Sequence, residues 1–251
     1  MSAPAAGRFG GRVALVTGGG RGIGRAIALG LAAEGAQVAV VARSAEQCEA
    51  VAAEIGDGGL AAPGDVSDAE SCERAVSFVL ARLGRPSVLV NAAGISPVRG
   101  RAERYDVGTF AEIVEVNLVG AFTMMHAAAA SLLDGGGAVV NVASTLGVTA
   151  SPLLSAYGAS KAGLIQLTRT LAREWAEHGV RVNALCPGYV ETELTSRMLA
   201  NPAILESVVA ATPLHRLAEM EEIVAPALFL ASEEASYITG AALLVDGGQA
   251  A

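Results

Sequence analysis

Short runs of apolar, mostly β-branched residues alternate along the chain with longer amphipathic stretches. Nearly every position in these runs is apolar, which is typical of parallel strands buried on both faces of a sheet. The pattern predicts strands at residues 13–16, 38–41, 88–90, 138–142, 180–185 and 242–245. A further, weakly marked strand is expected just before the polar segment "GDVSD" at 64–68.

Between these runs, apolar positions recur at the spacing of an α-helix. The predicted helices cover residues 23–33, 45–55, 69–83, 110–133, 155–178 and 221–231. Strands and helices that alternate in this way form right-handed βαβ units, so we expect an α/β fold with a doubly wound parallel sheet, a Rossmann fold. No linker or repeat interrupts the pattern. The chain is therefore expected to form a single domain over residues 12–251, preceded by a flexible tail at 1–11.

The longest region without a clear strand covers residues 187–219 and contains two short helical patterns between prolines. Excursions of this length in a compact α/β domain are often binding loops, so residues of about 189–215 are expected to form a substrate loop. A surface insertion without a function is the alternative.

Composition narrows the possible functions. Of the 251 residues, 52% are hydrophobic and 17% are charged, which indicates a globular chain with a large core. The net charge of −8 argues against nucleic acid or an anionic membrane as the partner. The sequence contains no uninterrupted run of eighteen apolar residues, so no membrane span is expected. Three cysteines without CxxC spacing predict neither a disulfide framework nor a zinc site, and they favour a cytoplasmic location.

The first predicted strand leads directly into "TGGGRGIG" at residues 17–24 and then into a helix. Gly18, Gly22 and Gly24 stand where the chain must turn tightly and approach a ligand closely. The N-terminus of the helix then presents free N–H groups to a pyrophosphate. The strand before the turn and the helix after it predict a dinucleotide site.

The end of the second strand indicates which dinucleotide is bound. NAD sites usually carry an acidic residue there, whereas this strand is followed by Arg43, and Arg21 lies in the glycine turn. Guanidinium groups bind phosphate through two parallel hydrogen bonds, so the pair favours NADP(H) over NAD(H). The alternative is two ordinary surface arginines.

Two further segments follow predicted strands at their carboxyl ends, where open α/β sheets bind ligands. Asp65 in "GDVSD" is well placed to meet an adenine amino group. Asn91 in "VNAAG" either borders the cofactor or ties loops together.

Tyr157 and Lys161 are four residues apart near the start of a predicted helix, so they project from the same face. Lys161 is the only lysine in a chain with sixteen arginines. A compact ammonium beside a phenol is expected to lower the pKa of Tyr157, so that Tyr157 acts as the general acid and base in hydride transfer to a carbonyl. Ser144, at the end of a strand, would polarise the carbonyl oxygen, and Asn117 is the one amide in an apolar helix.

The sequence resembles the short-chain dehydrogenase/reductase family, in its short single-domain branch, over nearly the whole chain. The resemblance is carried by "TGGGRGIG", "NAAG", "EVNLVGAF", "YGASK", "PGYVET" and "YITGAALLVDGG", together with the spacing from Ser144 to Tyr157. It implies a catalytic tetrad of Asn117, Ser144, Tyr157 and Lys161, in which Asn117 supports a water that relays protons from the lysine. Ala92 departs from the "NNAG" that the family usually has.

The resemblance also implies that Val190 and Thr192 hold the nicotinamide carboxamide, and that the protein is a homotetramer or else a homodimer. No metal ligand is expected. The complete set of expected cofactor-binding residues is Gly18, Arg21, Gly22, Ile23, Gly24, Arg43, Asp65, Val66, Asn91, Ala92, Gly94, Tyr157, Lys161, Pro187, Gly188, Val190 and Thr192.

The substrate is expected to be a small molecule, a ketone or secondary alcohol without a required charge, because the expected pocket residues are mainly apolar: Leu146, Leu153, Leu154 and Tyr189. Reductases of 3-oxoacyl thioesters and small ketones are the nearest general match in the family. An acidic carrier protein would want a basic rim, which the segments "LLDGGGA" and "AEHGV" lack. Dehydrogenases of sugars, steroids or cyclic alcohols are alternatives. A scaffold that senses NADP(H) without catalysis is a different class, which has no need of the tetrad.

Overall fold

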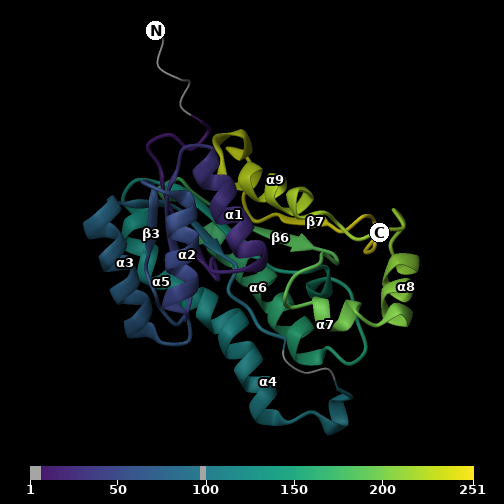
Figure 1. The fold of residues 1–251 in the computed structure, drawn as a ribbon. Coiled ribbons are helices and arrows are strands. Elements are labelled where there is room, and N and C mark those ends of the chain that lie inside the picture. The colour runs from purple at the N-terminus through teal and green to yellow at the C-terminus, as the bar shows by residue number, and fades with distance from the viewer. Residues whose placement is uncertain (1–6, 97–99) are drawn as a thin grey trace.

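The computed structural model describes residues 7–96 and 100–251, which form one α/β domain around a seven-stranded parallel sheet (Figure 1). The strands lie in the order β3-β2-β1-β4-β5-β6-β7. Their bounds are β1 Val13–Thr17, β2 Gln37–Val41, β3 Gly59–Ala61, β4 Pro86–Asn91, β5 Gly137–Val142, β6 Val180–Pro187 and β7 Ala242–Val245. The doubly wound Rossmann fold that the sequence predicts is confirmed.

Helices cover both faces of the sheet (Figure 1). Their bounds are α1 Gly22–Ala33, α2 Ala45–Ile55, α3 Ala69–Leu83, α4 Val107–Val114, α5 Gly120–Leu133, α6 Ser155–Glu174, α7 Ser196–Leu199, α8 Pro202–Ala211 and α9 Met220–Ala231. The described residues form two hydrophobic cores. The first core contains side chains of α1, α2 and α9, and the second contains side chains of α3, α5 and α6. Side chains alternate along each strand: Ala14 and Val16 enter the first core, whereas Val13 and Leu15 enter the second.

The N-terminal residues differ from the predicted flexible tail. Residues 1–6 lie outside the described part of the chain, but Phe9 is fully buried and its N–H donates to the carbonyl oxygen of Glu34 at 3.0 Å. Residues 7–11 therefore pack as a turn on the domain, which begins before residue 12.

One long helix, Val107–Leu133, comprises α4, a π-helical turn at Glu115–Val119, and α5. Its mean hydropathy reaches 1.5 over the most apolar window, and by length and composition it could cross a membrane. Met124, Met125 and Leu132 are fully buried against the sheet, so we assign the helix to the core of the domain. The π turn is a departure from the regular helix that the sequence predicts, and Asn117 lies within it.

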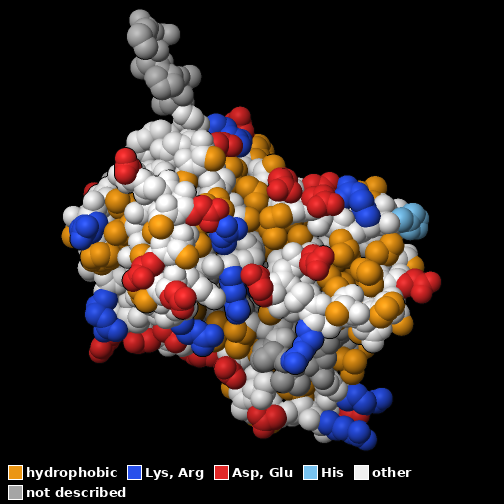
Figure 2. Space-filling view, in the orientation of Figure 1, with side chains coloured by type: hydrophobic (Ala, Val, Ile, Leu, Met, Phe, Trp, Pro, Cys, Tyr) orange, Lys and Arg blue, Asp and Glu red, His pale blue; other side chains and the backbone are white. Residues whose placement is uncertain are grey.

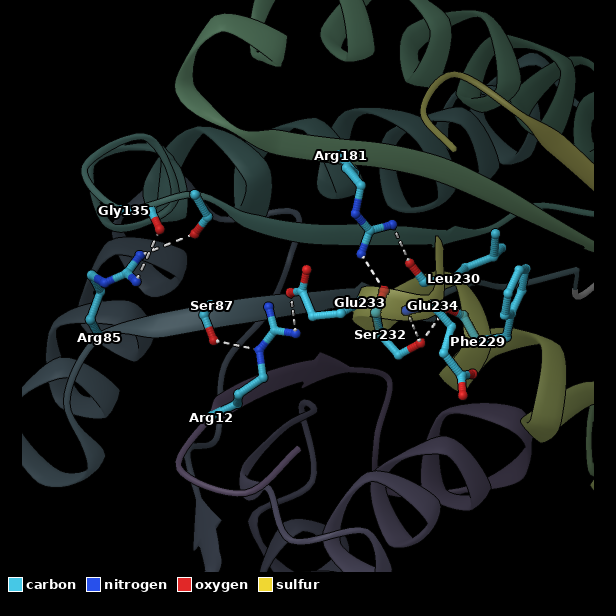
Figure 3. A network of polar contacts seen from close by, with 11 residues as sticks. Arg12, Arg85, Ser87, Gly135, Arg181, Phe229, Leu230, Ser232, Glu233 and Glu234 are labelled. Atoms are coloured by element: carbon cyan, nitrogen blue, oxygen red, sulfur yellow. Dashed lines mark hydrogen bonds and ion pairs between the residues drawn. The ribbon is translucent and has the colours of Figure 1, made fainter. Parts of the chain in front are cut away.

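Arginines close the end of the sheet at which β1, β4 and β6 begin (Figure 3). Arg181 donates to the carbonyl oxygens of Leu230 at 2.8 Å and Ser232 at 2.7 Å, and Arg85 donates to that of Ser131 at 2.8 Å. These carbonyls stand at or just beyond the C-termini of α9 and α5, where backbone acceptors lack helical partners and cations are favourable. The opposite end of the sheet, at the carboxyl ends of the strands, carries the candidate site.

Candidate active site

A cleft of about 390 Å³ opens at the carboxyl ends of β1, β2, β4, β5 and β6. It lies where β1 has β2 on one side and β4 on the other, the point at which the chain reverses direction across the sheet. Every residue expected to be catalytic or to bind the cofactor lines this cleft, apart from Asn91 and Asn117.

The glycine turn fits closely against the loop that follows β4. A Cβ atom placed on Gly18 would lie 2.6 Å from the backbone nitrogen of Ala93, and one on Gly24 would lie 2.3 Å from the carbonyl oxygen of Gly18. Gly18 and Gly22 also have φ values of +65° and +53°, in the left-handed region. Only glycine meets these conditions, and α1 begins directly at Gly22. Its open N-terminus is suited to the pyrophosphate of a dinucleotide.

Arg21 and Arg43 line the cleft beyond the carboxyl ends of β1 and β2 and are exposed. Within the described ranges, neither side chain makes an ion pair or a hydrogen bond. Ser44 and Gln47, which the sequence-based set omitted, line the same cleft. Two guanidinium groups without a carboxylate at bonding distance fit a phosphate on the ribose.

Asp65 is held in its own turn. Its Oδ1 accepts hydrogen bonds from the N–H of Ser67 at 3.0 Å and from the Ser67 hydroxyl at 2.7 Å. Burial alone would raise the pKa of Asp65, but these bonds and the charge of Arg43 outweigh burial and lower that pKa. Asp65 is therefore an ionised, oriented acceptor at the wall of the cleft.

Asn91 does not line the cleft. It is buried, and its amide donates to Oδ1 of Asn141 at 2.9 Å, while the amide of Asn141 donates to Thr168 at 2.9 Å. The side chain thus joins β4 to β5 and, through Asn141, to α6. This arrangement favours the structural alternative for Asn91, and a cofactor contact by Asn91 stays a prediction.

Tyr157 and Lys161 lie one turn apart on α6, and they line the cleft together with Ser144, which follows β5. Ser144 lies near enough to Tyr157 for its hydroxyl to favour the phenolate. Lys161 is 4% exposed, and its Nζ donates to the carbonyl oxygen of Val142 at 2.8 Å. The structure therefore brings three members of the expected tetrad to one place.

The pKa values differ from the expectation that Lys161 lowers the pKa of Tyr157. Burial raises the pKa of Tyr157 to about 12, although the nearby Ser144 hydroxyl acts in the opposite direction. Burial also lowers the pKa of Lys161 to about 8. Removal from water destabilises a charge on either group and is the largest cause of both shifts. Lys161 still carries its proton at neutral pH.

Asn117 lies behind the cleft in the π turn, fully buried. Its Oδ1 accepts from the N–H of Ile95 at 2.7 Å, and its amide donates to the carbonyl oxygen of Ile95 at 3.0 Å and to the Ser160 hydroxyl at 3.1 Å. Ser160 donates in turn to the carbonyl oxygen of Tyr157 at 2.7 Å. The Asn117 side chain therefore joins the loop after β4 to the helix of Tyr157, and a proton relay through Asn117 stays a prediction.

None of the four side chains expected to form the substrate pocket lines the cleft. Leu146, Leu153 and Leu154 do not line it, and Tyr189 borders a second cavity of about 300 Å³ beside β7. Leu153 has a φ of +70°, a backbone strain that no sequence pattern reveals. The cleft is instead lined by Leu194 and Thr195 of the expected substrate loop, and by Ile95 and Val116, which the sequence did not indicate. In the described part of the chain, no group of histidines, cysteines and acidic residues is arranged to hold a metal ion.

Comparison with known proteins adds the family. A family model described as enoyl-(acyl carrier protein) reductase matches residues 18–250. The chain is 44% identical to the galactitol 2-dehydrogenase (L-tagatose-forming) of Cereibacter sphaeroides, with 96% of each chain covered. It is 41% identical to the D-threitol dehydrogenase of Mycolicibacterium smegmatis, covering 96% of this chain and 94% of the other.

Two further relatives bear on the substrate and the cofactor. The chain is 38% identical to a 3-oxoacyl-acyl-carrier-protein reductase of Staphylococcus aureus, with 94% of this chain and 96% of the other covered. The crystal structure of a gluconate 5-dehydrogenase from Burkholderia cenocepacia, in complex with NADP and tartrate, superposes with a TM-score of 0.92 at 34% identity, with 98% of each chain covered.

Proposed function

The chain belongs to the short-chain dehydrogenase/reductase family, and on that premise we propose that it transfers hydride between NADP(H) and a small ketone or secondary alcohol, with Tyr157 as the general acid and base. The family makes it an oxidoreductase that acts on alcohols and ketones. The observation that carries the finer proposal is that Ser144, Tyr157 and the buried Lys161 line the same cleft as the glycine turn.

The cradle formed by the glycine turn, Arg21 and Arg43 would hold the pyrophosphate and the ribose phosphate, and Val190 and Thr192 would hold the nicotinamide end. When bound, the nicotinamide supplies the hydride for reduction of a carbonyl carbon, or accepts it in the reverse direction.

The proton that the carbonyl oxygen needs is supplied by side chains of this chain. In reduction, Ser144 donates a hydrogen bond to the carbonyl oxygen while Tyr157 transfers its phenolic proton to that oxygen. The phenolate left on Tyr157 is stabilised by the ammonium of Lys161, whose Nζ lies 5.7 Å from the centre of the ring. In the protein without substrate, the high pKa of Tyr157 keeps the phenol protonated.

Within this class, we place small polyols and cyclic alcohols ahead of acyl thioesters. The sugar-alcohol dehydrogenases of Cereibacter sphaeroides and Mycolicibacterium smegmatis are more similar to the chain than the acyl-carrier-protein reductase is. Arginines also lie scattered among acidic side chains on the face in Figure 2, without the broad basic field that an acidic carrier protein favours. A 3-oxoacyl thioester stays the second candidate, on the strength of the 38% identity.

Two further properties belong to the proposal. Three free, buried cysteines support a reducing, cytoplasmic location. Exposed apolar side chains on the long helix and near β7 support a homotetramer, or else a homodimer: Phe122, Leu214, Tyr237 and Leu244. Sedimentation equilibrium measures the assembly directly.

The test is NADPH oxidation, and the reverse reduction of NADP, against a panel of polyols, keto-sugars, cyclic ketones, a steroid and an acetoacetyl thioester. Turnover that is confined to one class and absent from Tyr157→Phe supports the proposal and identifies the substrate class. Tight NADPH binding without turnover on any compound would favour a cofactor-sensing scaffold instead.

A further inference from the structure

The carboxylate of Glu193 lies over the glycine turn. A Cβ atom placed on Gly22 would be 3.4 Å from Glu193 Oε2 and 3.7 Å from Cβ of Thr192. Glu193 lines the same cleft as Gly20, Arg21 and Gly22. An acidic side chain from the segment after β6 thus stands at the N-terminus of α1, on the side where the turn is open.

Nothing within α1 serves this N-terminus. The helix has no acidic residue in its first turn, and the side chain of Arg21 at the N-cap position makes no capping hydrogen bond. The first N–H groups of a helix have no intrahelical partner, and their partial positive charge attracts anions. Glu193, in turn, makes no ion pair or side-chain hydrogen bond with any described residue. An unpaired carboxylate and an uncapped helix end therefore face each other.

The backbone beneath Glu193 is fixed. The hydroxyl of Thr195 donates to the carbonyl oxygen of Val190 at 2.7 Å and accepts from the N–H of Thr192 at 2.9 Å. The N–H of Ser196 bonds the carbonyl oxygen of Thr192 at 2.7 Å, and Val190 is buried. Since Glu193 itself is exposed, its side chain can rotate away while this tight turn stays in place.

We infer that Glu193 is a gate for the cofactor: its carboxylate occupies the pyrophosphate position on α1 and must rotate out before a dinucleotide binds. The inference rests on the proposed use of this turn for NADP(H). Two negative groups cannot share one helix end at low cost, so the carboxylate and the pyrophosphate compete. Glu193 thereby weakens cofactor affinity and stabilises the turn when no dinucleotide is on it.

The test is calorimetric titration of NADPH into the purified full-length chain and into Glu193→Gln, with Glu191→Gln as the matched control. Glu191 is an exposed carboxylate two residues away that does not line the cleft, and its substitution changes the net charge by the same amount. We expect Glu193→Gln to bind NADPH about 3- to 10-fold more tightly and Glu191→Gln to match the wild type. Adenosine 2′-phosphate, which has no pyrophosphate, should bind all three proteins equally.

A second measurement gives an effect of opposite sign. Without nucleotide, Glu193→Gln should melt about 1 °C below the wild type, because the helix end loses its anion. Equal NADPH affinity in the Glu193 and Glu191 variants would overturn the gate while leaving the proposed function intact. A wild type that binds neither NADPH nor NADH would instead overturn the proposed function, and the gate with it.

Discussion

The ammonium nitrogen of Lys161 lies 5.7 Å from the centre of the Tyr157 ring, one helical turn away, and both side chains line the cleft. Burial shifts the pKa of each group toward its neutral form, to about 12 for Tyr157 and about 8 for Lys161. At neutral pH, Tyr157 is therefore an uncharged phenol and Lys161 is a positively charged ammonium. This state is the one that a proton donor to a carbonyl requires.

Replacing Tyr157 with Phe removes the proton donor and little else, because the ring remains. We expect turnover to fall about 10³-fold or more, with NADPH affinity changed less than about twofold. Steady-state kinetics and calorimetry on the same preparation measure both. A variant that kept a tenth of the wild-type rate would exclude Tyr157 as the acid.

Lys161→Arg keeps the positive charge but not its shape. The site holds a compact ammonium that donates to the carbonyl oxygen of Val142, and a planar guanidinium is too broad for that position. We expect a loss of about 10²-fold in kcat/KM. Full activity in this variant would show that the reaction does not require a compact charge at position 161.

The reduction rate should depend on the proton of Lys161. Its pKa of about 8 is below the ordinary lysine value, so the ammonium is present at lower pH and is lost as the pH rises through 8. We expect kcat/KM for ketone reduction to be level near pH 7 and to fall about tenfold per unit at higher pH. Circular dichroism at pH 9 checks that the fold persists. A profile that stayed level to pH 9.5 would contradict the role of the charge.

The unpaired arginines Arg21 and Arg43 should set the cofactor preference. Removing both in Arg21→Ala/Arg43→Ala takes away the expected partners of the ribose phosphate, so NADPH should bind about 10- to 100-fold more weakly, with NADH affinity nearly unchanged. Titrations at one ionic strength provide the comparison. Arg82→Ala/Arg173→Ala, which changes two exposed arginines outside the cleft on α3 and α6, controls for the loss of two positive charges. Equal losses for both nucleotides would indicate a general electrostatic effect.

Arg181 should matter for stability and not for chemistry. Its two hydrogen bonds satisfy carbonyls at the end of α9, and Arg181→Met leaves them without that donor. We expect the free energy of unfolding to fall by about 2 kcal/mol, with unchanged KM. Chemical denaturation measures the difference. Arg173→Met, an exposed arginine on α6 with no hydrogen bond or ion pair to a described residue, is the control and should have little effect.

The apolar pattern was sufficient for most elements because both faces of a parallel sheet are buried. The bounds of α2, α3 and β7 agree with the sequence to the residue. By contrast, β3 has only three residues and begins at Gly59, so its composition carries almost no strand signal. The π turn at Glu115–Val119 was also invisible, since one inserted residue barely changes the helical spacing.

For the site, strand ends and glycine spacing located the cleft, because these features follow from topology. What failed depends on packing in three dimensions. The pKa of Tyr157 is governed by burial, which a pairing rule does not contain. The side chain of Asn91 turns toward Asn141 because the two residues are in register on β4 and β5, a relation that the sequence alone does not supply. Glu193 approaches Gly22 across 171 positions of the chain, from 22 to 193.

The arginine contacts lie at the amino end of the sheet, so the two ends of the sheet differ in how firmly their loops are held. Arg12, Arg85 and Arg181 bind side chains and carbonyls of segments far apart in sequence (Figure 3). They precede or begin strands, whereas the cleft lies at the carboxyl ends of the strands. Loops at the carboxyl end of the sheet, where the cleft lies, do not contribute to these contacts at the helix ends. A protein engineer could therefore exchange the segment between β6 and α9 for that of a relative and expect the scaffold to tolerate the graft.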